Sequence, residues 1–173
     1  MKVYIVGSLE NPVIPEATNA LIAAGFDVFS DWFAAGPGAD YAWADYEKKR
    51  GRSYRDALTS PAAQNVFRFD LRNLLAANVV VQVMPSGKSA AWEMGFAAGR
   101  GKPTFILMDE PGKKTKWDVM ALFAGEPIND EEVRDNPDFF RTPGVAYNIE
   151  ELISMIHTYM ARLMIGDREV ETA

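Results

Sequence analysis

Short apolar runs alternate with longer amphipathic segments along most of the chain. The apolar runs predict buried strands at residues 2–6, 26–29, 79–83, 104–108 and 145–147. Helical patterns separate them, and a strand, helix and strand in succession predict a right-handed crossover in a parallel sheet. The pattern therefore predicts an α/β fold with a doubly wound, mainly parallel five-stranded sheet and helices on both faces, of the Rossmann or flavodoxin type.

Several helix boundaries are marked by residues that start or stop helices. Pro15 opens the first helix, and Gly25 follows it where a left-handed cap would lie. Ser60 and Pro61 form an N-cap and first-turn pair for a helix that should run to about residue 78. These signals mark the starts of two predicted helices and the end of one of them.

One domain with one insertion is predicted. The final helix is capped by Asn148, and the chain beyond Gly166 is expected to fray, so the domain spans residues 1–166 and the tail 167–173. The segment at about 31–60 breaks the alternation by mixing charges with aromatic residues, among them Tyr41, Trp43, Tyr46 and Tyr54. Such an insertion is either a binding lid or a partly helical excursion that covers the sheet edge.

The composition is that of a globular protein with an acid excess. With 173 residues, of which 48% are hydrophobic, the chain can bury a sizeable core in one domain. A net charge of -6 argues against nucleic acid as the main partner, and the basic run at 48–52 suits a solvated face better than a phosphate site. The absence of cysteine suits a reducing cytoplasm, and no apolar run is long enough to span a membrane. A cytoplasmic protein with neither nucleic-acid nor membrane partners is predicted.

The stretch after the most strand-like run carries one carboxylate in apolar surroundings. Residues 85–99 read as a turn and then a helix crowded with small and apolar residues, with Glu93 as its acid. The simpler account is that the helix dipole stabilises a first-turn acid by about 0.3–1 kcal/mol. If Ser89 is the N-cap, a capping box would need its acid at Trp92, one place before Glu93. Because ligands of open α/β sheets bind outside the carboxyl ends of strands, Glu93 is also a candidate functional residue.

A second carboxylate falls among apolar positions of the preceding helix. Asp70 lies three residues after Phe67 and four before Leu74, which places it within or at the rim of the apolar stripe. An unpaired buried charge is costly, so Asp70 should be paired, hydrogen-bonded or facing a cavity. Together, Asp70 and Glu93 suit glycosidic chemistry, in which one carboxylate attacks an anomeric carbon and forms a covalent glycosyl intermediate.

Other catalytic and cofactor motifs are incomplete. Gly87-Lys88-Ser89 resembles the end of a phosphate loop, but Gln82 stands where the leading glycine is required. No G-x-G-x-x-G follows the first strand, and the single histidine, His157, falls in the final helix, which leaves no basis for Ser-His catalysis. A metal would need oxygen ligands alone, and no acidic cluster demands one. The sequence therefore predicts neither cofactor nor metal.

The residues around the two carboxylates resemble the nucleoside 2-deoxyribosyltransferase family. The likeness runs through residues 1–7, Asp70-Leu71, the strand 79–83, Trp92-Glu93-Met94-Gly95-Phe96-Ala97 and Gly101-Lys102-Pro103, and weakly into 118–120. The resemblance implies the fold predicted above. It also implies that Glu93 is the nucleophile that takes the deoxyribosyl group at C1′, that Asp70 is the acid assisting at base and sugar, and that the sugar passes to another base.

The resemblance further implies substrate contacts and an oligomer. The implied substrate-binding residues are Gly7, Ser8, Ser86, Gly87, Lys88, Ser89, Trp92, Asp118 and Met120. In the family, the segment at the position of Asp118 to Met120 reaches into a neighbouring subunit's site. A homo-oligomer, dimer or higher, is therefore implied, with a nucleoside or nucleotide and a free nucleobase as small-molecule partners.

Two positions depart from the family pattern and leave the substrate open. Gly87 stands where the transferases carry an Asp that holds the sugar's 5′ hydroxyl, and Asp118 stands where they carry an Asn. Relatives that hydrolyse nucleoside 5′-monophosphates use small hydroxyl residues in the loop at 86–89, and a helix N-terminus with Ser and Lys suits an anion. The alternatives are therefore a deoxyribosyltransferase, a nucleoside 5′-monophosphate N-glycosidase and a catalytically silent nucleotide-binding module.

Overall fold

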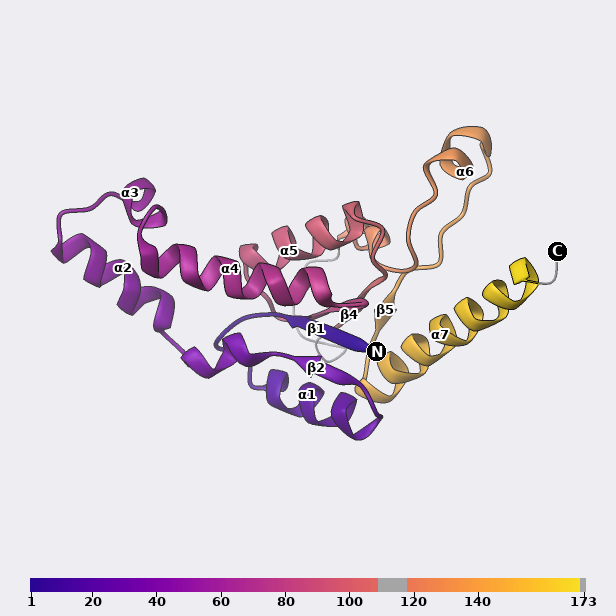
Figure 1. Cartoon of the computed structure of the whole chain (residues 1–173), viewed down its shortest axis with the longest axis horizontal. Coiled ribbons are helices and arrows are strands. Elements are labelled where there is room, and N and C mark those ends of the chain that lie inside the picture. Colours follow the sequence, from indigo (N-terminus) through magenta and orange to yellow (C-terminus); the bar gives the residue numbers. More distant parts are fainter. Residues whose placement is uncertain (109–117, 172–173) are drawn as a thin grey trace.

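A single parallel sheet forms the centre of the molecule. The computed structural model describes residues 1–108 and 118–171, with side chains through Leu163. The strands are β1 (Lys2–Val6), β2 (Asp27–Phe29), β3 (Val79–Val83), β4 (Thr104–Leu107) and β5 (Val145–Ala146). They pair in the order β2-β1-β3-β4-β5, and every pair is parallel (Figure 1). The predicted α/β fold is thus confirmed, with three strands one residue shorter than expected.

Helices cover both faces because alternate side chains of each strand point to opposite sides. Helices α1 (Val13–Ala23) and α7 (Ile149–Glu171) pack on the face that carries Val3, Ile5 and Val81. Helices α4 (Pro61–Ala76) and α5 (Lys88–Gly99) pack on the other face, which carries Tyr4 and Val80. Strands buried on both sides are expected to be largely apolar, and β1, β3 and β4 each carry a single non-aliphatic polar or charged residue besides Tyr4.

Side-chain caps explain where most helices begin. Ser60 accepts a hydrogen bond from the backbone N–H of Ala63 at 3.2 Å, as predicted for an N-cap. Helix α1 begins at Val13 rather than Pro15, because the Oδ1 of Asn11 accepts from the N–H of Val13 at 2.9 Å. Gly25 has φ = 91° and so fills the predicted left-handed position after this helix.

One helix end differs from the prediction and one helix start agrees with it. Helix α4 stops at Ala76, before residue 78, because the N–H of Asn78 already donates to the carbonyl of Lys2 in the sheet. The predicted cap at Asn148 is confirmed by a 2.7 Å hydrogen bond from the N–H of Glu151. Helix α7 is assigned through Glu171, and fraying of the chain beyond Gly166 stays a prediction.

The insertion at 31–60 is a helical arm. The two predicted alternatives are a binding lid and a partly helical excursion that covers the sheet edge, and the helical content fits the second. It contains η1 (Asp31–Ala35), α2 (Ala39–Lys49) and α3 (Tyr54–Leu58), and it projects from one end of the molecule (Figure 1). Glu47 in α2 is 3% exposed and pairs with Arg52 at 3.2 Å. At its base, the indole N–H of Trp32 donates to the carbonyl of Ile5 at 2.7 Å, so this aromatic residue belongs to the core.

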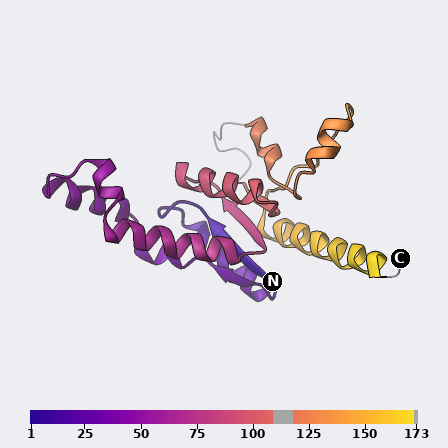
Figure 2. The same cartoon turned by 45° about the horizontal axis from the view of Figure 1, so that its top comes forward.

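A second excursion lies between β4 and β5 at the opposite end of the molecule. It contains η2 (Val119–Phe123) and α6 (Asp130–Asp135), and turning the view shows it standing away from α7 (Figure 2). η2 is a 3-10 helix, and residues 109–117, which precede it, lie outside the described residues. Within the described ranges, no helix is long and apolar enough to cross a membrane.

Candidate active site

The sheet order places the candidate site at a change of direction in the chain. Strand β1 is flanked by β2 and β3, so the connections after β1 and β3 leave to opposite faces of the sheet. A ligand crevice is expected at the carboxyl ends of these two strands. Gly7 and Ser8 follow β1, and residues 84–89 follow β3, so these two predicted binding segments meet there. In open sheets of this kind, ligands bind at this crevice.

Asn11 ties the two loops of the crevice together. Its side-chain amide donates to the carbonyls of Val83 at 3.3 Å and Pro85 at 3.1 Å, and the residue is only 2% exposed. Gly7 lets Ile14 of α1 pack closely against the end of β1, since a Cβ on Gly7 would lie 2.6 Å from the Cδ1 of Ile14. Sequence reasoning missed Asn11, although a polar residue just before a helix is a recognisable capping signal.

Glu93 lies over the sheet rather than in the first turn of its helix. Helix α5 begins at Lys88 with Gly87 as its N-cap, so Glu93 falls in the second turn. The helix dipole acts mainly within the first turn, so it does not account for this carboxylate. Burial raises the pKa of Glu93 to about 7, the nearby Asp70 also raises it, and a hydroxyl interaction with Tyr4 opposes the rise. Near neutral pH, Glu93 therefore exchanges a proton readily.

Asp70 reaches the same place from the neighbouring helix. Helix α4 lies beside α5 on the same face of the sheet, and the charges of Asp70 and Glu93 act on each other. The Oδ1 of Asp70 is buried without a hydrogen-bond partner among the described residues. Burial raises the pKa of Asp70 to about 6. The structure thus brings the two predicted carboxylates together, and one oxygen lacks the partner that a purely structural acid would be expected to have.

Tyr4 completes the carboxylate pair and was not predicted. It is 1% exposed on β1, its ring stacks on Phe29 at 5.1 Å, and its hydroxyl interacts with Glu93. Burial and both carboxylates raise the pKa of Tyr4 above its usual range, so it remains a neutral donor. The signal for it is a phenol inside the otherwise aliphatic strand KVYIV, because a buried tyrosine hydroxyl usually needs a partner.

The loop between β3 and α5 presents polar groups at the carboxyl end of the sheet. The amide of Gln82 donates to the Oγ of Ser86 at 2.5 Å, and that hydroxyl approaches the Sδ of Met84 at 3.3 Å. Lys88 and Ser89 are exposed, and their side chains form no hydrogen bond or ion pair within residues 1–108 and 118–163. Both side chains are thus exposed at the carboxyl end of β3, where a ligand is expected.

The remaining predicted binding residues lie on exposed surfaces. Trp92 is 77% exposed on the outer side of α5, away from the sheet. Met120 is 58% exposed in η2, and the carboxylate of Asp118 accepts from its backbone N–H at 2.9 Å. In one chain, therefore, Asp118 acts as a local cap, and its predicted contact with a neighbouring subunit's site stays a prediction.

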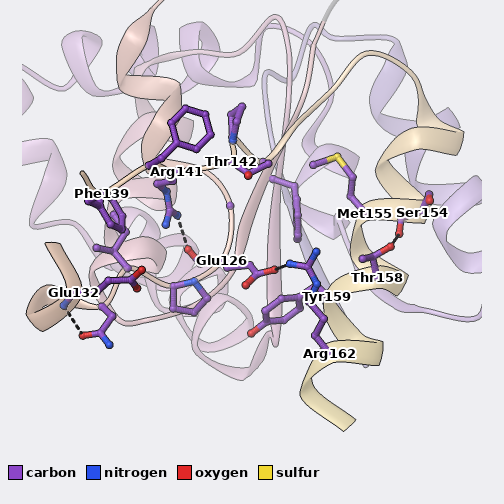
Figure 3. A pocket seen from close by; sticks show the side chains of 18 residues that line it. Glu126, Glu132, Phe139, Arg141, Thr142, Ser154, Met155, Thr158, Tyr159 and Arg162 are labelled. Carbon is purple, nitrogen blue, oxygen red and sulfur yellow. Dashed lines mark hydrogen bonds and ion pairs between the residues drawn. The ribbon is translucent and has the colours of Figure 1, made fainter. Parts of the chain in front are cut away.

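A cavity of about 400 Å³ lies elsewhere, between the segment 125–144 and helix α7 (Figure 3). An ion pair of 2.6 Å joins Glu126 to Arg162 across it. Neither carboxylate of the candidate site lines this cavity. No group of three or more histidine or acidic side chains is placed to hold a metal ion in the parts of the chain described.

Comparison with known proteins places the chain by its fold. No model of a known protein family matches the sequence, and no curated protein is detectably similar to it. A 2-deoxyribosyltransferase from Bacillus psychrosaccharolyticus superposes with a TM-score of 0.52 at 19% identity, over 83% of this chain and 98% of that one. A conserved protein from Enterococcus faecalis V583 gives 0.50 at 14% identity, over 92% and 98%. This chain thus shares its fold with nearly the whole of the Bacillus 2-deoxyribosyltransferase.

Proposed function

We propose that the protein cleaves the N-glycosidic bond of 2′-deoxynucleosides and passes the sugar to another base. The observation that carries the proposal is the paired Glu93 and Asp70, with pKa values of about 7 and 6, beside the ligand crevice of the sheet. The shared fold supports it, because the Bacillus neighbour is a 2-deoxyribosyltransferase described as a biocatalyst for nucleoside synthesis. The family resemblance of the residues around Glu93 supports it independently.

The proposed chemistry uses Glu93 as an ionised carboxylate and Asp70 as a protonated acid. The Glu93 carboxylate attacks C1′ and forms an ester as the C1′–N bond breaks, and its electron pair leaves with the base. Asp70 gives its proton to the departing base nitrogen, and the negative carboxylate stabilises the positive charge that builds on the sugar. A second base then gives its N–H proton to the Asp70 carboxylate, attacks C1′ and releases Glu93 as a carboxylate. Water in place of that base would likewise pass a proton to Asp70 and give hydrolysis.

The active form needs Glu93 ionised and a proton on Asp70. Burial raises the pKa of Asp70 to about 6 and that of Glu93 to about 7, so the pair can hold one proton near neutral pH. The hydroxyl of Tyr4 lowers the pKa of Glu93 and so favours its ionised form. We therefore assign Tyr4 a positioning role for the nucleophile.

A product assay tests the proposal directly. Each deoxynucleoside is incubated with the protein and a different free base, and the new nucleoside is identified by chromatography and mass spectrometry. Exchange by the native protein and its loss in Glu93→Ala and Glu93→Gln are expected. Glu16→Gln, on the exposed surface of α1, serves as a matched control and should retain exchange. Exchange that survives in both Glu93 variants would contradict the role of this residue.

A second candidate function is hydrolysis of nucleoside 5′-monophosphates. It is favoured by Gly87 in place of an acid and by exposed Lys88 and Ser89 at the start of α5, where backbone N–H groups and the helix dipole suit a phosphate. This activity would release free base and deoxyribose 5-phosphate. Lys88→Ala should then raise KM for monophosphates and leave KM for nucleosides unchanged, whereas Lys88→Arg should preserve both. Equal KM values for monophosphates and nucleosides in the native protein would exclude this candidate.

The proposed enzyme acts as a homo-oligomer whose sites are shared between subunits. In a single chain, Met120 and Trp92 are exposed, and η2 lies on the same face of the sheet as α5 because its Ala121 packs against the same core cluster. A neighbouring subunit could therefore present Asp118 and Met120 to the crevice. A protein that binds nucleotides without turnover is the remaining alternative, and detection of a glycosyl adduct on Glu93 would exclude it.

A further inference from the structure

The cavity between the segment 125–144 and helix α7 lies apart from the candidate active site (Figure 3). Its volume of about 400 Å³ falls within the range of about 300–1,000 Å³ that is usual for small-molecule sites in proteins. Its lining includes neither Asp70 nor Glu93, nor any residue of the loop 84–89. The residues of the proposed reaction therefore do not account for it.

Backbone contacts with the sheet hold the base of the cavity in place. The N–H of Thr104 donates to the carbonyl of Gly125 at 2.9 Å, and the N–H of Ile106 donates to that of Gly144 at 2.7 Å. The two glycines touch, since a Cβ on Gly144 would lie 2.5 Å from the backbone nitrogen of Gly125. The segment is thus fixed to β4 at both of its ends, so the cavity needs no ligand in order to form.

The walls of the cavity are largely apolar and partly aromatic. Phe105 of β4 lines it and is only 3% exposed. Ile128 and Phe139 line it from the segment 125–144, and Met155 and Tyr159 line it from α7. These four side chains are half-buried. Flat rings and a polarisable thioether favour a planar aromatic ligand, because they can contact its faces.

The charged groups that line the cavity cancel one another. They are two acids, Glu126 and Glu132, and two bases, Arg141 and Arg162. Glu126 pairs with Arg162 at 2.6 Å, and the guanidinium of Arg141 donates to the carbonyls of Leu122 and Glu126 (Figure 3). Because the four formal charges sum to zero, a ligand with a net charge gains little attraction there. An uncharged ligand is therefore favoured.

The ion pair still offers hydrogen bonds of both kinds to a ligand. Glu126 uses Oε1 and Arg162 uses Nη1 in their pairing, and their other polar side-chain atoms have no partner among residues 1–108 and 118–163. Burial and the nearby Glu126 raise the pKa of Tyr159, so its hydroxyl remains a neutral donor. An acceptor and several donors thus lie next to one another at the wall formed by α7 (Figure 3).

We propose that this cavity is a second ligand site, which binds a free nucleobase. A nucleobase is a flat, uncharged aromatic ring whose edge carries hydrogen-bond donors and acceptors side by side. Phe139 and Met155 contact its faces, and the pair of Glu126 and Arg162, with the hydroxyl of Tyr159, binds its edge. A flat ring without such an edge would leave these polar groups unpaired.

The choice of a nucleobase rests on the proposed function, in which one free base is released and another is taken up. The site itself does not rest on it, because it follows from the lining of the cavity. Binding is measured without turnover, so an absence of base exchange would leave the second site standing. Conversely, exchange by a protein whose cavity binds no base would overturn the second site and retain the enzyme.

NMR of protein with isotope-labelled methionine methyl groups tests where a base binds. Met155 lines the cavity and Met84 lies in the loop after β3, so the two methyl groups report on the two places. Each signal is assigned by its loss in Met155→Leu or Met84→Leu. Titration with adenine should move the Met155 signal until it saturates. A Met155 signal that stays unmoved up to the solubility limit of adenine, whatever the response of Met84, would overturn the proposal.

Substitutions on α7 test whether the cavity itself holds the base. Thr158→Trp places an indole at the cavity wall and should weaken the binding of adenine by about tenfold or more in the same titration. Ala161→Trp, at an exposed position of α7 that does not line the cavity, is the matched control and should bind adenine as the native protein does. Equal binding by the two variants would place the base elsewhere and overturn the proposal.

Benzoate, a flat ring with a negative charge, tests the assigned class of ligand. It should bind to the native protein about tenfold more weakly than adenine, because Glu126 repels it. Glu126→Gln leaves Arg162 without its partner, so this variant should bind benzoate more tightly than the native protein does. Benzoate that binds to the native protein as tightly as adenine would overturn the assignment of a nucleobase.

Discussion

Replacing Glu93 by glutamine should stabilise the protein at pH 8 while it abolishes activity. Burial holds the pKa of Glu93 at about 7, above its ordinary value of 4.5. The folded protein therefore binds the proton more tightly than the unfolded chain, so this carboxyl favours folding below pH 4.5 and loses that contribution as pH rises to 7. A glutamine side chain at this position would carry no charge at any pH and would escape the loss. We expect the two proteins to differ most above pH 7.

The magnitude follows from the two pKa values. A change from 4.5 to about 7 corresponds to about 3 kcal/mol at 1.36 kcal/mol per pH unit. Because Glu93 is only partly buried, solvent screening reduces the expected gain to about 1–2 kcal/mol. Glutamine is close in size to glutamate and can still accept a hydrogen bond from Tyr4. Packing differences should therefore be small beside the electrostatic gain.

Urea unfolding at pH 5 and pH 8 measures the effect. The protein concentration is kept fixed, because self-association would also stabilise the folded state. Glu93→Gln should unfold at a higher urea concentration than the native protein at pH 8 and at a similar one at pH 5. Glu16→Gln controls for loss of an exposed carboxylate. A variant that is less stable at pH 8, or one whose gain is equal at both pH values, would refute the reasoning that Glu93 is held in unfavourable surroundings.

Three further substitutions test neighbouring parts of the account. Tyr4→Phe removes the hydroxyl that lowers the pKa of Glu93, so kcat/KM should fall on the acid side of the pH profile, where ionised Glu93 is scarce, and stay unchanged on the alkaline side; an unchanged acid side would dissociate Tyr4 from the nucleophile. Asp70→Asn should remove the falling limb, which reports loss of the proton from the acid. Lys102→Met should lower the free energy of unfolding by about 1–2 kcal/mol, measured in urea, because the ammonium group caps the carbonyls of Leu75 and Ala77 after α4.

The strand pattern was sufficient to predict the sheet because burial on both faces leaves a readable signal. The run Val79–Val83 is apolar except for Gln82 and forms a central strand, and Ser60 caps α4 as its sequence indicates. Local signals of this kind need no knowledge of distant residues. The strand order was not predictable from them, because pairing of β1 with β3 depends on contacts between residues far apart in sequence.

Within the candidate site, helical periodicity alone was enough to predict the position of Asp70. The spacing of Asp70 within an apolar stripe indicated a partly buried carboxylate; the residue is half-buried, and burial raises its pKa to about 6. Tyr4 was missed because its role depends on α5 crossing above β1, which no local pattern reports. The start of α5 at Lys88 rather than after Ser89 also depends on tertiary context, since Gly87 offers no side-chain cap. Errors thus fall where long-range packing sets the geometry.

The account rests on Glu93 forming a covalent bond to a sugar. The most direct measurement is intact-protein and peptide mass spectrometry after incubation with a deoxynucleoside whose sugar leaves the enzyme slowly. We predict a mass increase of one deoxyribosyl group, carried by the peptide that contains Glu93 and absent from Glu93→Gln. Formation of exchanged nucleoside without any adduct, or an adduct on another residue, would contradict the central claim.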